Sequence, residues 1–350
     1  MLTRNVRSRQ GCKMGKNRTI HWCLVCNLLI TSKKCPICRN EASRLDLEPS
    51  GHLVPLSQNM IIPIRASIDA TYGEGCGEVL LPDNCVAFLD RSKKRSDIIV
   101  NGGKIGSIAD GKTNLDLSGM DAVSDKLTKN VVKCDHDSSF FIKKGHGLMV
   151  TGVKEVSPGL KKGDRVCILN DRGRAIAVAT MKMSSEEILE SDRGVAASIV
   201  RGGHARTCCN VPHHNWVKTL ELNQPTISSA AGMAIGSIKE LASSYSNNIV
   251  VDLSKDIRSE ASLLLTIDAG FIPKVLVHDR DEFLDYLIER YVLTVVDSVP
   301  DKCLLIADSY EGQSPDVVYH SPTSEWEPSM VWMYIMMKAV PFHPSHSKNL

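Results

Sequence analysis

The chain has 350 residues and carries 42 Lys and Arg against 40 Asp and Glu, so its formal net charge is only +2. Its hydrophobic content of 43% allows a normal buried interior and excludes an intrinsically disordered chain. No apolar run approaches the roughly 20 residues that a membrane span needs, and the first 18 residues lack the apolar stretch of a secretory signal. We therefore expect a cytoplasmic protein of two or three domains with no membrane association.

The charges are distributed unevenly along the chain. Residues 1–45 carry ten bases and the single acid Glu41, whereas residues 211–350 carry ten bases and 18 acids. Such blocks indicate different partners for the two ends. We expect residues 1–19 to form a basic arm, which is either a contact for a partner or simply solvated. The acidic C-terminal part is expected to offer a docking surface for a protein partner.

Four of the 12 cysteines are arranged as two Cys-x-x-Cys pairs, at Cys23, Cys26, Cys35 and Cys38. Each pair can turn back on itself so that both thiolates face one point, and four sulfur ligands are the preferred structural site of zinc. The spacing predicts a zinc ribbon over residues 20–45 with one structural Zn²⁺ and a short strand at 28–30. Iron in a rubredoxin-like site is the alternative. A disulfide is disfavoured without an export signal.

The remaining cysteines show no ligand spacing, and we expect most of them to be buried thiols. The adjacent Cys208 and Cys209, close in sequence to His213 and His214, leave open a second metal site.

Residues 46–135 are interpreted as a β-rich intermediate domain without catalytic signals. Its expected strands lie at 61–64, 78–81 and 85–89, followed by a hairpin whose two strands flank the turn at Asn101 to Gly103. No helix is expected after a strand there, so the glycines do not indicate a phosphate loop.

Residues 136–207 have the pattern of a small closed barrel, in which short apolar runs alternate with tight turns. Ser184 is placed to cap a helical turn. The expected strands are 147–153, 165–169, 175–180 and 194–200.

This segment resembles the PUA domain, an RNA-binding barrel. The resemblance rests on the runs KGDRV at 162–166, DRGRAIAV at 171–178 and MSSEE at 183–187. It implies contact with structured RNA rather than DNA, with basic side chains on the phosphates. The residues expected in this role are Lys143, Lys144, Lys154, Lys161, Lys162, Arg172 and Arg174. The alternative is an ordinary solvated surface, because nearby acids almost balance these bases.

Residues 208–350 change to alternating strands and helices, which predicts a parallel sheet. The expected helices are 226–246, 259–267 and 281–291, and the expected strands are 248–253, 272–277 and 293–296.

This last segment resembles the ATP pyrophosphatase-type domain of phosphoadenosine phosphosulfate (PAPS) reductases, an adenine nucleotide α-hydrolase-like fold. In that family a buried strand leads into Ser-Gly-Gly-Lys-Asp-Ser, whose glycines let backbone amides wrap a phosphate. Both glycines and the lysine are replaced in this chain. The matching positions are Ser254, Lys255, Asp256, Ile257, Arg258 and Ser259.

Three later segments, 304–311, 326–335 and 340–344, resemble further parts of the reductase family, although the arginine of the first is absent. The chain as a whole is similar to archaeal proteins that join a zinc ribbon and a PUA domain to a reductase-like domain. The sequence therefore predicts a multidomain α+β protein with an N-terminal ribbon, an intermediate domain, a PUA barrel and a C-terminal α/β domain.

The resemblance implies an RNA-binding protein linked to tRNA or rRNA modification or to translation, whose degenerate phosphate loop leaves it without enzyme activity. The alternative is an active ATP- or PAPS-dependent enzyme that transfers sulfur, or acts as a reductase, on RNA or a small acceptor. In that case Lys255 and Arg258 would replace the lost phosphate contacts.

Overall fold

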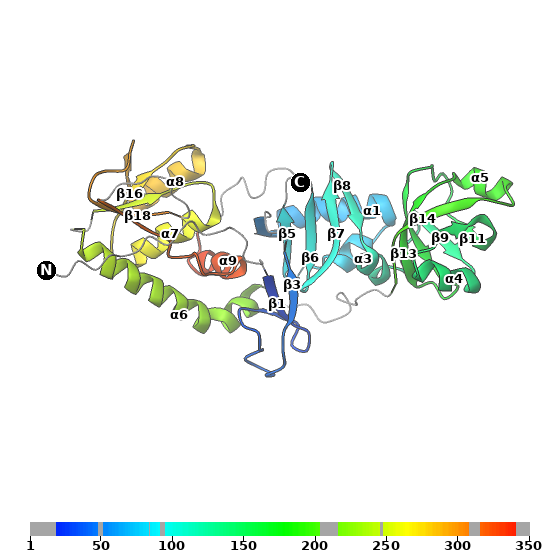
Figure 1. Ribbon diagram of the computed structural model, residues 1–350, viewed down its shortest axis with the longest axis horizontal. Coiled ribbons are helices and arrows are strands. Elements are labelled where there is room, and N and C mark those ends of the chain that lie inside the picture. Colours follow the sequence, from blue (N-terminus) through cyan, green and yellow to red (C-terminus); the bar gives the residue numbers. More distant parts are fainter. Residues whose placement is uncertain are drawn as a thin grey trace.

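The computed structural model describes residues 19–47, 52–83, 85–91, 95–203, 216–245, 248–307 and 316–340. These residues form an elongated molecule, with a C-terminal α/β unit at one end, the barrel at the other and an intermediate sheet between them (Figure 1). The basic arm, the Cys208–Cys209 pair and the chain end beyond residue 340 lie outside the described residues. Among the helices described, none combines the length and hydropathy needed to cross a membrane.

The first unit is a small antiparallel sheet in which β1 is the central strand. Its strands, in spatial order, are β2 (Leu28–Ile30), β1 (Thr19–Cys23) and β3 (Ser43–Asp46). The strand expected at 28–30 is confirmed. The two Cys-x-x-Cys turns meet at the end of the sheet where β1 finishes and β3 starts, one turn lying between β1 and β2 and the other between β2 and β3.

The intermediate domain combines helices with a five-stranded antiparallel sheet, so it is more helical than the sequence pattern indicates. The sheet runs in the order β4 (His52–Pro55), β5 (Ala87–Arg91), β6 (Ser96–Val100), β7 (Gly103–Ala109) and β8 (Lys112–Leu115). Three helices pack with it, namely α1 (Gln58–Tyr72), α2 (Cys76–Leu80) and α3 (Leu117–Ala122).

Two of the predicted strands are wrong, because residues 61–64 lie in α1 and residues 78–81 lie in and just after α2. The buried residues of α1 include Ile61, Ile64 and Ile68, so the apolar run is one turn of a longer helical repeat. Pro63 lies within α1, close to its start, where its missing N–H removes a single intrahelical bond.

The predicted hairpin is confirmed as β6 and β7, which pair from Val100 to Gly103. Its two-residue turn consists of Asn101 and Gly102, with φ values of 50° and 71°. Two successive positive φ values are typical of the type I′ turn that Asn-Gly favours. A β-carbon on Gly102 would lie 2.4 Å from the Trp22 side chain, so the turn also carries the contact with the first unit.

The barrel is a six-stranded sheet with an independent hydrophobic core. The predicted strands at 165–169 and 175–180 and the Ser184 cap are confirmed, the last as a capping box with Glu187. The expected boundary at residue 136 is several residues late, because β9 belongs to this sheet. Its strands run in the order β10 (Leu148–Met149), β14 (Val195–Gly202), β13 (Ala175–Met181), β12 (Arg165–Leu169), β9 (Val131–Cys134) and β11 (Val153–Val156).

Three short helical segments complete the barrel. They are α4 (His136–Lys143), η1 (Val150–Gly152) and α5 (Ser185–Glu190). The strand expected over 147–153 is thus divided, because η1 interrupts it between β10 and β11.

The C-terminal unit has the predicted parallel sheet, with β15 at its centre. The strand order is β17 (Thr294–Val296), β16 (Lys274–Leu276), β15 (Ile249–Asp252), β18 (Cys303–Ile306) and β19 (Val317–His320). In such sheets ligands bind where the strand order reverses, at the carboxyl ends of the strands. Here that point lies beside β15, which leads into the predicted phosphate loop.

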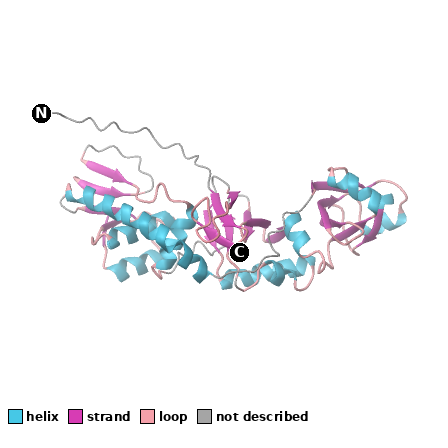
Figure 2. Cartoon of the chain, turned by 90° about the horizontal axis from the view of Figure 1, so that it is seen from below, coloured by secondary structure: helices cyan, strands magenta, loops and turns pink. Residues whose placement is uncertain are grey.

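The helices of this unit are α6 (Trp216–Ser243), α7 (Ile257–Asp268), α8 (Glu282–Tyr291) and α9 (Pro328–Met337). The helix expected to begin at residue 226 begins ten residues earlier, and Pro225 lies inside it. Figure 2 shows the helices of this unit at the end of the molecule opposite the barrel.

The first unit, the intermediate sheet and the C-terminal unit share one hydrophobic core. Trp22 on β1 and Phe88 on β5 are buried in it, and Phe88 makes an edge-to-face contact with Trp216 of α6, with ring centroids 5.1 Å apart. Trp332 of α9 donates an indole hydrogen bond to the carbonyl oxygen of Leu53 in β4. The first unit therefore packs against both of the others, which also contact each other directly.

Candidate metal centre, RNA interface and phosphate loop

The four predicted metal ligands come together at the tip of the first sheet. Their sulfur atoms all lie within 4.8 Å of one another, and they are the only group of this kind in the described part of the chain. The Sγ atoms of Cys23 and Cys38 are 3.5 Å apart, and those of Cys26 and Cys35 are 3.8 Å apart. A tetrahedral zinc site with Zn–S bonds of about 2.3 Å requires sulfur separations of about 3.8 Å. The donor set and its geometry therefore fit zinc.

The protonation of these thiols also agrees with a cation site. A hydrogen bond from the backbone of Asn40 lowers the pKa of Cys38 to about 7, whereas burial and then the neighbouring thiols raise the pKa of Cys26 to about 12. The backbone N–H of Cys26 donates to the Sγ atom of Cys23 over 3.3 Å. Four crowded sulfurs cannot all ionise unless a cation compensates their charge, which a divalent metal ion does.

The ribbon is held by helix α6 through one buried side chain, Asn223. Its Nδ2 atom donates to the carbonyl oxygen of Leu29 over 2.9 Å, and its Oδ1 atom accepts from the N–H of Thr31 over 3.0 Å. This contact was not predictable from the sequence, because the partners are more than 190 positions apart.

The basic residues predicted to contact RNA are spread over the barrel and have different environments. Lys154, Lys161, Lys162 and Arg172 are exposed, and Lys143 is half-buried at the end of α4. Arg174 makes a bidentate ion pair with the buried Asp121 of the intermediate domain, with N–O distances of 2.9 and 2.6 Å. This pair joins the barrel to α3, so Arg174 has a structural partner.

Two exposed aromatic side chains on α4 were missed by the sequence reasoning. Phe140 and Phe141 are 59% and 54% exposed, and their rings lie edge to face with centroids 5.7 Å apart. The Nζ atom of Lys144 lies 4.0 Å from the centroid of Phe140, and the ring of His146 is 6.2 Å from that of Phe141. The only sequence signal was the pair of adjacent phenylalanines on a short polar helix. Exposed rings beside cations are the usual platform for stacking RNA bases.

The predicted phosphate loop lies at the carboxyl end of β15, where the strand order reverses, and three of its backbone amides donate to side chains of the loop itself. The N–H of Ser254 donates to the Oγ atom of Ser259 over 2.8 Å, and the N–H of Asp256 donates to the Oγ atom of Ser254 over 3.2 Å. Asp256 is the N-cap of α7, and its carboxylate accepts from the N–H of Arg258 over 2.8 Å. A carboxylate of the chain thus takes the place that an anion would occupy at this helix end.

The two cations of the loop are also engaged by groups of the protein. The ammonium of Lys255 pairs with Asp279 and lies 3.7 Å from Asp281, and its pKa is raised chiefly by the bond to Asp279. The guanidinium of Arg258 donates to the carbonyl oxygens of Thr323 and Trp326, the latter over 2.8 Å. Arg258 therefore ties α7 to the turn before α9.

Known proteins support the identification of the barrel, and each of them matches only part of this chain. The archaeosine synthase subunit alpha of Thermococcus kodakarensis is 30% identical over 136 residues, which are 39% of this chain and 22% of that protein. A probable tRNA pseudouridine synthase B of Korarchaeum cryptofilum is 42% identical over 57 residues, which are 16% of this chain and 18% of that protein. The chain thus spans about a fifth of the length of these relatives.

Among solved structures, a conserved PUA domain protein from Thermoplasma acidophilum aligns with 46% of this chain and 99% of its own, with 19% identity and a TM-score of 0.36. The PUA domain family model matches residues 130–203, which begin just before β9 and end just after β14. The chain therefore contains a PUA domain, formed by residues 130–203.

Proposed function

We propose that this protein binds structured RNA through its PUA domain and zinc ribbon, and that it takes part in tRNA or rRNA modification or in translation. The observation that carries the proposal is the aromatic and basic surface of Phe140, Phe141 and Lys144 on the PUA domain. Two relatives are named as an archaeosine synthase subunit and a tRNA pseudouridine synthase, which supports an RNA of this class as the partner.

We propose further that the C-terminal unit is a PAPS reductase-like domain without nucleotide chemistry. Its loop lacks the glycines that let a backbone approach a phosphate, and three of its N–H groups and both of its cations are already bonded within the protein. At an effective dielectric constant of about 20, the Asp256 carboxylate would add roughly 4 kcal/mol of repulsion for each phosphate charge at 4 Å. Calorimetry with ATP and magnesium should give no heat of binding. Micromolar binding that is lost in Arg258→Ala would favour the active enzyme instead.

RNA binding is tested by measuring the affinity of the full chain for a folded tRNA at several salt concentrations. Affinity should fall as salt rises, because lysine and arginine contacts release counterions. Replacing Phe140 and Phe141 together by alanine should weaken binding at least about fivefold, the equivalent of one stacked base at about 1 kcal/mol. Leu189→Ala is the matched control, since Leu189 is an apolar residue on α5 of the same domain and is even more exposed, at 78%.

Reversing Lys161 and Lys162 to glutamate tests the predicted phosphate contacts separately. Affinity should fall to a similar extent for different RNA sequences, since such contacts position the RNA without reading bases. Unchanged affinity in both the aromatic and the lysine variants would refute the PUA domain as the RNA site.

A further inference from the structure

The two cysteine turns of the ribbon carry a cluster of exposed apolar side chains at their tips. Leu24 and Val25, between the first two ligands, are 54% and 67% exposed, and Ile37, between the last two, is 57% exposed. The sulfurs of each pair converge on one point, so the residues between them project away from it. The opposite side of the ribbon, with Ile20 and Trp22, is buried against the rest of the protein.

Basic residues flank the second cysteine pair, since Lys33 and Lys34 directly precede Cys35 and Arg39 directly follows Cys38. Lys33, Lys34 and Arg39 are exposed, and in the part of the chain that the structure describes no ion pair joins them to an acid. Glu41 is the one acid between Thr19 and Arg44. Residues 1–18, which lead directly into β1, add six bases and no acid. Even with the formal charge of −2 of a zinc tetrathiolate, this end of the chain keeps a surplus of positive charge.

We infer that this ribbon tip, defined as Leu24, Val25, Ile37 and the cations Lys33, Lys34 and Arg39, is a second RNA contact, separate from the PUA surface. The inference rests on the proposed function, of which it names the second binding surface. Cations placed around an apolar centre fit unpaired nucleotides, whose bases pack on the apolar side chains while the phosphates meet the cations. If the partner were instead an apolar groove on another protein, it would bind the apolar side chains of the tip without needing these cations.

The two surfaces lie on different units, with the intermediate domain between them (Figure 1). Arg174 and Asp121 fix the PUA domain to the intermediate domain, and the turn at Gly102 packs on Trp22 of the ribbon. Because the spacing of the surfaces is held in this way, one RNA long enough to reach both gains affinity from the second contact. An RNA too short to reach both gains nothing from the ribbon tip.

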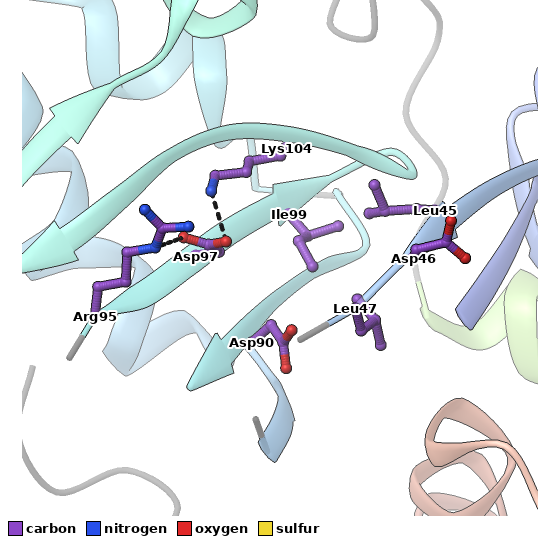
Figure 3. A pocket seen from close by; sticks show the side chains of 8 residues that line it. All are labelled: Leu45, Asp46, Leu47, Asp90, Arg95, Asp97, Ile99 and Lys104. Carbon is purple, nitrogen blue, oxygen red and sulfur yellow. Dashed lines mark hydrogen bonds and ion pairs between the residues drawn. The ribbon is translucent and has the colours of Figure 1, made fainter. Parts of the chain in front are cut away.

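A pocket of the intermediate domain does not offer a better site. It has a volume of about 320 Å³ and lies where β3 meets β5, β6 and β7 (Figure 3). Its central carboxylate, Asp97, is paired with both Arg95 and Lys104, at 3.1 and 2.6 Å. These charges compensate one another within the protein.

The test compares zinc-loaded full-length proteins on a whole tRNA and on a short RNA duplex that has no unpaired nucleotides and is too short to reach both surfaces. The ribbon variant carries Lys33→Glu, Lys34→Glu and Arg39→Glu. The matched control carries Lys239→Glu, Lys274→Glu and Lys302→Glu, which change the net charge equally on the exposed surface of the C-terminal unit. Zinc content, measured for every variant, verifies that the ribbon remains folded.

The ribbon variant should bind the whole tRNA at least about tenfold more weakly than the control. The slope of its log affinity against log salt concentration should be smaller by about two, because three contacts to unpaired nucleotides are lost. Leu24→Ser with Val25→Ser should weaken tRNA binding without changing the salt dependence. Both should bind the short duplex like the wild type. Ribbon and control variants of equal affinity for tRNA would overturn the inference, and the proposed function would stand for the PUA domain alone if the Phe140 and Phe141 variant is still weakened. A wild-type chain that binds no RNA would refute the proposed function itself.

Discussion

Replacing Asn223 by alanine should loosen the zinc ribbon from helix α6 without touching a metal ligand. The change removes the donor to the buried carbonyl of Leu29 and the acceptor for the N–H of Thr31. A buried polar group that loses its partner costs about 1–3 kcal/mol, and Thr31, which is only half-buried, can recover part of this from water. We therefore expect the free energy of unfolding of the ribbon to fall by about 2–4 kcal/mol.

Hydrogen exchange of the amides in β1 and β2 measures this loss locally, and denaturant unfolding measures it for the shared core. Gln224→Ala is the matched control, because Gln224 is the exposed neighbour of Asn223 on the same helix. A stability change within about 0.5 kcal/mol of the control would show that the ribbon is not held by these bonds. The reasoning about how the ribbon is attached would then be refuted.

Three further changes test other parts of the fold. Asp256→Ala should cost about 0.5–2 kcal/mol of stability in denaturant unfolding, because α7 loses its cap, and a stability equal to the wild type would contradict this. Val292→Gly should raise the melting temperature by relieving about 1 kcal/mol of strain, since this β-branched residue has φ of 54° and is 79% exposed. Burial raises the pKa of Glu260 from 4.5 to about 8, so the folded state retains a proton that the unfolded chain releases. Stability is therefore lost as pH rises from about 4.5 to about 8, and Glu260→Gln should flatten this pH dependence.

The sequence was most informative where local pattern and local structure agree. The Asn-Gly turn, the Ser184 cap and the two long strands of the PUA domain follow from residues close together in the chain, and the structure confirms each. The parallel order of the C-terminal sheet was also predictable, because strands alternating with helices permit few other arrangements. The four cysteines were predicted from their spacing alone, and their sulfurs do converge.

The failures share a physical cause, since each depends on contacts between distant segments or on a pattern longer than the run considered. The apolar run at 61–64 was assigned to a strand because four residues cannot reveal a helical repeat that extends to Tyr72. The ion pair of Arg174 with Asp121 was not predicted, because the two residues are 53 positions apart. The partners of Lys255 and Arg258 were equally hidden.

The loop after β15 shows how bonds within the protein can hold the segment that the proposed function describes as a degenerate phosphate loop. Helix α7 is buried along most of its length and packs in the shared core, so its removal would expose a large apolar surface. The loop itself contributes only hydrogen bonds to the start of α7 and ion pairs. Side chains of the protein can make these interactions as well as a bound phosphate can. Once Asp256 caps α7 and Arg258 holds the turn before α9, the helix no longer needs a ligand to satisfy its first amides. The same bonds make α7 and α9 one rigid support for Trp332, which reaches the intermediate sheet. Through these contacts and the bonds of Asn223, the C-terminal unit holds the ribbon and the intermediate domain in a fixed arrangement.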